Sequence, residues 1–174
     1  MKKIAMEEAV AEATRQLKAG AFLLTGGDVL NAMTIGWCQW GVVWERPVCT
    51  VFVRKSRYTY DLMQSGTFTV SVPEPGTMKK ELTYCGTKSG RDVNKAKELK
   101  LSFTPIGEGL VPALSGCTIH FACKTLFHTD FDAEKMQKDM DADTLKRFYG
   151  ANQKLGNGDP HVAFFGEVVG AYRE

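Results

Sequence analysis

A succession of short strand-like segments, separated by glycine, proline and polar turns, is the feature that most constrains how this chain can fold. The clearest segment is 67–72, in which Phe68, Val70 and Val72 alternate with hydroxyl residues, a pattern typical of a half-buried strand. Further strands are predicted at residues 21–25, 31–43, 48–53, 101–106, 118–127 and 161–172. At least six short strands with few helices predict a mainly β fold, a closed β-barrel or sandwich that carries peripheral helices.

The helical segments are few and short. An amphipathic helix is predicted over residues 4–19, with Gly20 in the position of a C-terminal cap. Shorter helices are expected at 59–64 and 77–84, and one or two at 132–149, with Gly150 as a stop. Turns or loops are expected at 26–28, 85–94 and 153–159. Since no repeat, linker or boundary interrupts the pattern, we expect one domain over residues 1–174.

Size and charge exclude several classes of protein. The 174 residues are enough to bury a core without disulfides or metal. Lys plus Arg number 22 and Asp plus Glu 20, and this net charge of +2 gives no general attraction to nucleic acid or acidic membranes. No run of eighteen apolar residues predicts a membrane span, and the N-terminus turns acidic before any apolar run, unlike a signal peptide. We therefore expect a cytoplasmic protein.

The five cysteines favour reduced thiols, because their number is odd, no Cys-x-x-Cys occurs and secretion is not indicated. Cys117, His120 and Cys123 could be interpreted as zinc ligands. The segment around them has the character of a strand, however, and alternation would point His120 away from both thiols. Small buried thiols are the favoured interpretation, and no metal site is expected.

Two basic clusters are candidate anion sites. Residues 54–57, Arg-Lys-Ser-Arg, follow a predicted strand and precede Thr59, and residues 87–92 have a similar mixture of hydroxyl, glycine and arginine. Arginine, hydroxyl and backbone N–H groups could bind a phosphate at either cluster. A pair of solvated basic turns is the alternative, and the residues alone favour it for each cluster taken singly. Neither a P-loop nor a dinucleotide-binding fingerprint is present.

A third feature is the segment 31–37, in which polar Asn31 and Thr34 interrupt an apolar strand. Gly36 beside Trp37 would let a flat group approach the backbone, and an edge strand with a packed tryptophan is the alternative. Familiar catalytic patterns are absent: there is no Gly-x-Ser-x-Gly, and the three histidines have no metal-like spacing. We therefore assign no catalytic side chain.

Taken in order, five segments resemble the flavin reductase-like family with the FMN-binding split-barrel fold, and most closely its flavoredoxin-type members. They are residues 31–37, 53–60, 66–72, 85–92 and 161–168, and the resemblance extends from about residue 22 to residue 172. The resemblance implies a six-stranded antiparallel split β-barrel, a homodimer, and FMN bound near the subunit interface.

The resemblance also implies positions for the cofactor. The isoalloxazine would be lined by Asn31, Met33, Thr34, Ile35 and Trp37. The phosphate and ribityl chain would be surrounded by Arg54, Lys55, Ser56, Arg57, Thr59, Ser89, Gly90 and Arg91. His161 is the candidate for guiding a nicotinamide donor, and Cys85 could approach the cofactor, although inert packing is the favoured interpretation of this thiol.

By this resemblance the protein is an FMN-binding oxidoreductase, fed either by NAD(P)H or, as an electron carrier, by a redox protein. A non-catalytic module that stores or senses flavin on the same barrel is the alternative. Binding of single-stranded nucleic acid is suggested only by the cations and tyrosines of residues 54–60, and the low net charge disfavours it.

Overall fold

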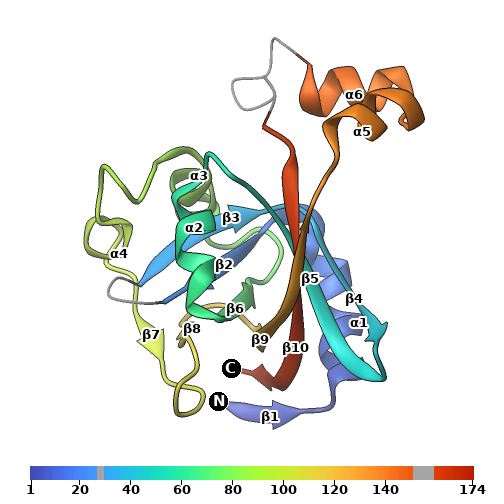
Figure 1. Cartoon of the computed structure of the whole chain (residues 1–174). Helices are drawn as coiled ribbons and strands as arrows, with labels where there is room; N and C mark the ends of the chain where they lie inside the picture. The colour runs from blue at the N-terminus through green and yellow to red at the C-terminus, as the bar shows by residue number, and fades with distance from the viewer. Residues whose placement is uncertain (27–29, 151–158) are drawn as a thin grey trace.

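The computed structural model describes residues 1–26, 30–150 and 159–174 of the chain. Its main element is an antiparallel sheet in the order β3-β2-β6-β9-β10-β5-β4, with β1 paired to β10 (Figure 1). These strands are β1 (Lys2–Ile4), β2 (Ala21–Thr25), β3 (Asn31–Ile35), β4 (Cys38–Val43), β5 (Arg46–Arg54), β6 (Thr67–Val72), β9 (Ile119–Asp130) and β10 (His161–Arg173). The path is open, with β3 at one end and β4 at the other. The predicted fold class, mainly β with peripheral helices, is confirmed, whereas the closed barrel or sandwich predicted from the strand pattern is wrong because the sheet of the described residues does not close.

Helices surround the sheet and a small hairpin covers part of it (Figure 1). The helices are α1 (Met6–Gln16), η1 (Leu17–Ala19), α2 (Tyr58–Leu62), η2 (Met63–Ser65), α3 (Lys79–Thr87), α4 (Lys95–Glu98), α5 (Ala133–Asp139) and α6 (Ala142–Tyr149), and the hairpin pairs β7 (Phe103–Thr104) with β8 (Ala113–Leu114). No helix in the part of the chain that the structure describes is long and apolar enough to cross a membrane.

Strand β6 shows how the sequence pattern builds the core, and where it falls short. Phe68, Val70 and Val72 are fully buried in the main apolar cluster, as their alternation predicts. The opposite face is buried too, so the prediction of a half-buried strand is wrong. Thr69 donates its hydroxyl to the Val111 carbonyl, and the Ser71 hydroxyl accepts from the Leu114 N–H, so the covering segment satisfies both polar groups.

The single strand predicted at 31–43 is two strands that lie at opposite ends of the sheet. The chain bends at Gly36, so that β3 pairs with β2 whereas β4 pairs with β5. Alternation cannot show such a break, because both halves keep the period of a strand. The bend is what places Trp37 between the two ends of the sheet.

The other differences concern element boundaries. The first helix begins at Met6, because Lys2–Ile4 forms an edge strand on β10; Gly20, at φ 106°, follows its final 3-10 turn. Helix α3 continues to Thr87, so Cys85 is helical and not in a loop, since Leu82 and Cys85 pack in a second apolar cluster. Of the strand predicted at 101–106, only β7 forms. The turns expected at 26–28 and 153–159 lie almost wholly outside the described residues.

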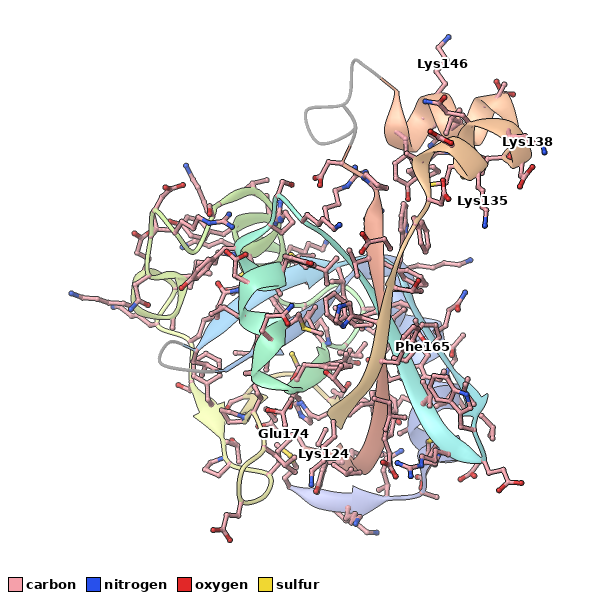
Figure 2. All side chains as sticks on the ribbon, in the orientation of Figure 1. Lys124, Lys135, Lys138, Lys146, Phe165 and Glu174 are labelled. Carbon is pink, nitrogen blue, oxygen red and sulfur yellow. The ribbon has the colours of Figure 1, made fainter. Side chains whose placement is uncertain are left out.

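One end of β9 and of β10 extends beyond the neighbouring strands of the sheet, toward α5 and α6; these two helices are called the arm (Figure 1). The two helices fall within the predicted range, and their N-terminal N–H groups are capped by the carboxylates of Asp132 and Asp141. Figure 2 shows Lys135, Lys138 and Lys146 extending outward from this arm. The base of the arm, where α6 ends and β10 begins, lies at the site described next.

Candidate functional site

Two adjoining pockets lie where the ends of β3, β5, α3 and β10 meet. The aromatic pocket, about 210 Å³, is lined by Met33, Thr34, Ile35, Gly36, Trp37, Phe52, Arg54, Arg57, Gly86 and His161. The basic pocket, also about 210 Å³, is lined by Ser56, Arg57, Tyr58, Thr59, Thr87, Lys88, Ser89, Gly90 and Lys95. Arg57 belongs to both, so the pockets adjoin at its side chain.

The two basic clusters of the sequence meet in space. The Arg57 guanidinium donates to the Gly86 carbonyl at 2.9 Å, and the Arg91 guanidinium donates to the Ser56 carbonyl at 2.9 Å. Arg91 also pairs with Asp61 at 2.7 Å, so its charge is used to hold the clusters together. The structure therefore favours one shared anion site over two separate solvated turns.

The side chains of the first basic cluster, residues 54–57, lie in different surroundings. Arg57 and Ser56 line the basic pocket, and the Ser56 hydroxyl and N–H donate to the Asp159 carboxylate. Arg54 is buried and lines the aromatic pocket, where its guanidinium donates to the carbonyls of Phe148 and Asp159, each at 2.8 Å. Lys55 pairs with Asp130 and lines neither pocket.

Close packing underlies the basic pocket. A Cβ on Gly90 would lie 2.5 Å from Asn31 Oδ1 and 2.7 Å from a ring carbon of Tyr58, so only glycine fits there. The Asn31 amide donates to the Thr59 hydroxyl at 3.0 Å, between β3 and α2. Asn31, expected beside an isoalloxazine, is therefore placed below the basic pocket, and Ser89, Gly90 and Thr59 line that pocket.

Lys95 is a lining residue that the sequence analysis missed. Its side chain is buried, and the ammonium donates to the carbonyls of Ala32 at 2.8 Å and Cys85 at 3.1 Å. Burial, with Arg57 adding a smaller effect, lowers the pKa of Lys95 to about 8. In the sequence it is one lysine of the charged run 95–98, which is indistinguishable from a solvated helix; only the fold shows that it is enclosed.

Two residues of α6, Phe148 and Tyr149, pack behind the Trp37 and His161 wall of the aromatic pocket. The Trp37 ring packs against His161 at 4.7 Å and edge-on against Phe148 at 5.1 Å between centroids. The Tyr149 hydroxyl lies 2.8 Å from Nδ1 of His161. Burial, followed by the Arg54 charge, lowers the pKa of His161 to about 4, so the imidazole is neutral at physiological pH.

The cysteines lie apart from this chemistry. Cys85 is fully buried in α3 and lines neither pocket, and burial raises the pKa of its thiol. His120 bonds Ser71, whereas Cys123 packs in the main apolar cluster on the opposite face of β9, which confirms the predicted alternation for Cys123. Cys117 lies before β9, so the alternation does not extend to it, and its backbone hydrogen-bonds the His120 imidazole. Within residues 1–26, 30–150 and 159–174, no three His, Cys, Asp or Glu side chains are placed to hold a metal ion.

The two pockets suit a ligand that is flat at one end and anionic at the other. Trp37, Phe52 and neutral His161 offer ring surfaces and a polar atom, whereas Arg57, Lys88 and Lys95 offer positive charge. None of the described lining residues carries a carboxylate, although the Asp159 carboxylate accepts from Ser56 of the basic pocket. Apart from this exposed Ser56–Asp159 pair, the described lining residues offer no nucleophile with an adjacent base, so the reactive chemistry would come from the ligand.

The model of one domain family, described as the flavin reductase like domain, matches residues 14–174. The chain belongs to the flavin reductase-like family. The open antiparallel sheet, of eight strands in the described part of the chain, is that of a split barrel.

Solved structures of flavin reductase-like proteins share this fold. A flavoredoxin from Methanosarcina acetivorans is 25% identical and superposes with a TM-score of 0.64, covering 89% of this chain and 68% of that one. An FMN-binding protein from Thermus thermophilus, solved with bound p-hydroxybenzaldehyde, is 21% identical (TM-score 0.64; 89% and 71% covered). An NADH:FAD oxidoreductase from Streptomyces globisporus is 19% identical (TM-score 0.62; 100% and 88% covered).

A relative by sequence is an uncharacterised protein from Archaeoglobus fulgidus, 28% identical over 105 residues. The match covers 60% of this flavin reductase-like chain and 58% of the relative, so it spans less than two thirds of that protein's length.

Proposed function

We propose that this protein binds FMN and acts as an oxidoreductase of the flavin reductase-like family. The observation that carries the proposal is the junction of the aromatic and basic pockets at Arg57. A flavin mononucleotide has the two matching ends, a planar ring system and a phosphate dianion. Family membership supports a flavin, and the cationic lining of the basic pocket supports the mononucleotide.

Each pocket has a distinct task in this proposal. Arg57, Lys88 and Lys95 would hold the phosphate, because a hydrogen bond from a cation to an anionic oxygen is stronger than a neutral one; Arg57 is half-buried, Lys95 is buried and Lys88 is exposed. Trp37 and Phe52 would hold the ring, and backbone groups of 33–36 would supply fixed polar contacts. When bound, the flavin supplies the two-electron redox chemistry, and the protein supplies binding and orientation.

The electron donor belongs to the same proposal. We expect NAD(P)H or a redox protein to deliver the electrons. His161, whose imidazole is neutral, lines the aromatic pocket and is the candidate for contacting a nicotinamide donor. A cytoplasmic location remains a prediction.

We also propose that the protein is a homodimer. Trp44 and Phe127 are exposed, at 59% and 51%, and pack edge-to-face beside Phe165. Phe165 is labelled in Figure 2. Exposed aromatic side chains that contact one another are typical of a surface that a partner covers. Light scattering should give twice the monomer mass, and Trp44→Ser should raise the dissociation constant of the dimer, whereas a monomer at micromolar concentration would contradict the proposal.

An absorption titration tests the function directly. The purified protein is mixed with FMN under anaerobic conditions, freed of unbound flavin, and then treated with NADH, NADPH or dithionite. Retained flavin bands that bleach with a nicotinamide are expected of a reductase, and bands that bleach only with dithionite are expected of an electron carrier. Flavin that is retained but passes electrons to no acceptor would favour the non-catalytic storage module. Failure to retain FMN or riboflavin from excess would contradict the proposal.

A further inference from the structure

The end of α6 and the start of β10 make one contact for which the proposed function gives no role. Tyr149 is the last residue of α6 and His161 the first of β10, and the hydroxyl of one lies 2.8 Å from Nδ1 of the other. The two rings are nearly perpendicular, at 88°, with centroids 5.6 Å apart. Helix α6 therefore reaches the wall of the aromatic pocket through two polar contacts, Tyr149 to His161 and the Phe148 carbonyl to Arg54.

The acidities of the two groups decide which atom of this pair donates the hydrogen bond. The Arg54 guanidinium lies over the Tyr149 ring, 5.0 Å from its centroid, while it donates to the carbonyls of Phe148 and Asp159. Burial raises the pKa of the Tyr149 hydroxyl, and the Arg54 charge lowers it by less. A phenol is still a stronger acid than a neutral imidazole N–H, and an imidazole nitrogen is a stronger base than a phenol oxygen. Tyr149 is therefore the donor and His161 Nδ1 the acceptor.

The direction of this bond fixes the proton of the imidazole. The pKa of His161 is lowered to about 4 by burial and by the Arg54 charge, so the ring carries one proton at neutral pH. Because Nδ1 accepts from Tyr149, that proton resides on Nε2. Within the described part of the chain Nε2 has no hydrogen-bond partner, and His161 lines the aromatic pocket.

The ring of His161 is also held in place. Trp37 packs on it at 4.7 Å and Phe131 at 6.3 Å between centroids, and its exposed fraction is only 8%. A donor held in this way is oriented before any ligand arrives, so it loses little entropy when it binds.

We propose that Tyr149 is a positioning residue that holds neutral His161 in the tautomer protonated at Nε2, so that the aromatic pocket presents an N–H donor to a carbonyl or ring nitrogen of the planar ligand. The identity of that ligand, a flavin or a nicotinamide, rests on the proposed function. The assignment of the tautomer does not rest on the proposed function, because every group that determines it belongs to this chain.

The first test identifies the tautomer of His161 in the protein without a ligand. Two-bond ¹H–¹⁵N correlation spectra of the imidazole-labelled apoprotein distinguish the two neutral tautomers, and His161→Gln assigns the signal among the three histidines. We expect Nε2–H in the wild type, and a mixture or the Nδ1–H form in Tyr149→Phe. Tyr84→Phe is the matched control, since its hydroxyl contacts Glu98 away from both pockets. An Nδ1–H wild type, or an unchanged spectrum in Tyr149→Phe, would overturn the proposal.

The second test measures the affinity of the protein for flavins. Tyr149→Phe should weaken FMN and riboflavin equally, about three- to tenfold, because the lost bond lies at the ring and not at the phosphate. Tyr84→Phe should bind both flavins as the wild type does, and circular dichroism checks that both variants are folded. A changed tautomer with unchanged affinity for FMN, riboflavin and the nicotinamide donor would overturn the role of the N–H donor. A wild type that binds neither flavin would overturn the proposed function, whereas the tautomer measured in the apoprotein would still decide the part of the proposal that concerns Tyr149.

Discussion

Arg57 and Lys55 are two residues apart and both positively charged, yet they face different parts of the molecule. Arg57 is half-buried between the two pockets and donates to the Gly86 carbonyl, whereas Lys55 is exposed and pairs with Asp130. Burial lowers the pKa of Arg57, and Arg54 lowers it further, without removing the charge at neutral pH. The pair therefore offers a test in which position is varied and charge is not.

Arg57→Ala should weaken FMN binding by about 1.5–3 kcal/mol, the range for hydrogen bonds to a charged group. Riboflavin, which lacks the phosphate, should be little affected, and Lys55→Ala should leave both affinities unchanged. Fluorescence titration of the three proteins with both flavins measures these differences. Equal losses for FMN and riboflavin in Arg57→Ala would contradict the assignment of the phosphate to the basic pocket.

Lys95 predicts a pH dependence of FMN binding. Its pKa of about 8 in the folded protein rises when a phosphate dianion binds beside it, so proton uptake accompanies binding above pH 8. FMN affinity should therefore fall as the pH rises from about 8, and riboflavin affinity should not. Isothermal titration in buffers of different ionisation enthalpy measures the uptake, which should vanish in Lys95→Met. The same pH dependence in that variant would exclude Lys95 as its source.

At the scale of elements, β10 connects the parts of the molecule. It pairs with β9, β5 and β1, and its first residue lines the aromatic pocket. Its register with β9 shifts at Phe165–Gly166, where the strand passes over the core. A Cβ on Gly166 would lie 2.4 Å from Phe68 Cζ and 2.9 Å from Cys123 Cβ, so the strand needs glycine here.

Gly166→Ala should lower the free energy of unfolding by about 2 kcal/mol, since the fully buried Phe68 ring has little room to move. Gly41→Ala in β4 is the matched control, because a Cβ there would have no heavy atom of the described residues within 4 Å beyond its chain neighbours, and its effect should stay within about 0.5 kcal/mol. Urea unfolding of both variants measures the difference. Equal stability of the two variants would show that the core accommodates the methyl group.

At the scale of the whole molecule, two buried histidines link stability to pH. His120 is fully buried and His161 is 8% exposed, and burial lowers the pKa of each to about 4 from 6.5. Between those two values the unfolded chain binds more protons than the folded one. The stability that this difference provides is complete above pH 6.5 and is lost as the pH falls toward 4.

The free energy of unfolding should therefore fall between pH 6.5 and pH 4, by about 3 kcal/mol for each histidine. Urea unfolding at a series of pH values measures the slope. His120→Asn should remove about half of it, because the amide can keep the bond to Ser71 but does not titrate in this range. An unchanged slope in that variant would assign the pH dependence to other groups.

The sequence by itself determined the local structure. Alternation placed β6, a terminal glycine marked the end of the first helical segment, and the resemblance of five ordered segments identified the family and the split barrel. It also picked out most of the residues that line the two pockets, including Arg57, Ser89 and His161. These features depend on neighbours within a few residues or on motifs in a fixed order, and both can be recognised in the sequence.

Only the tertiary structure decided what those residues face. It divided 31–43 between two ends of the sheet, turned Lys55 away from the pockets, and enclosed Lys95, which nothing in its local sequence distinguishes. It also joined the two basic clusters through Arg91 and brought the hydroxyl of Tyr149 to His161. These outcomes depend on contacts between segments far apart in sequence, and such contacts exist only once the sheet has set which strands are neighbours.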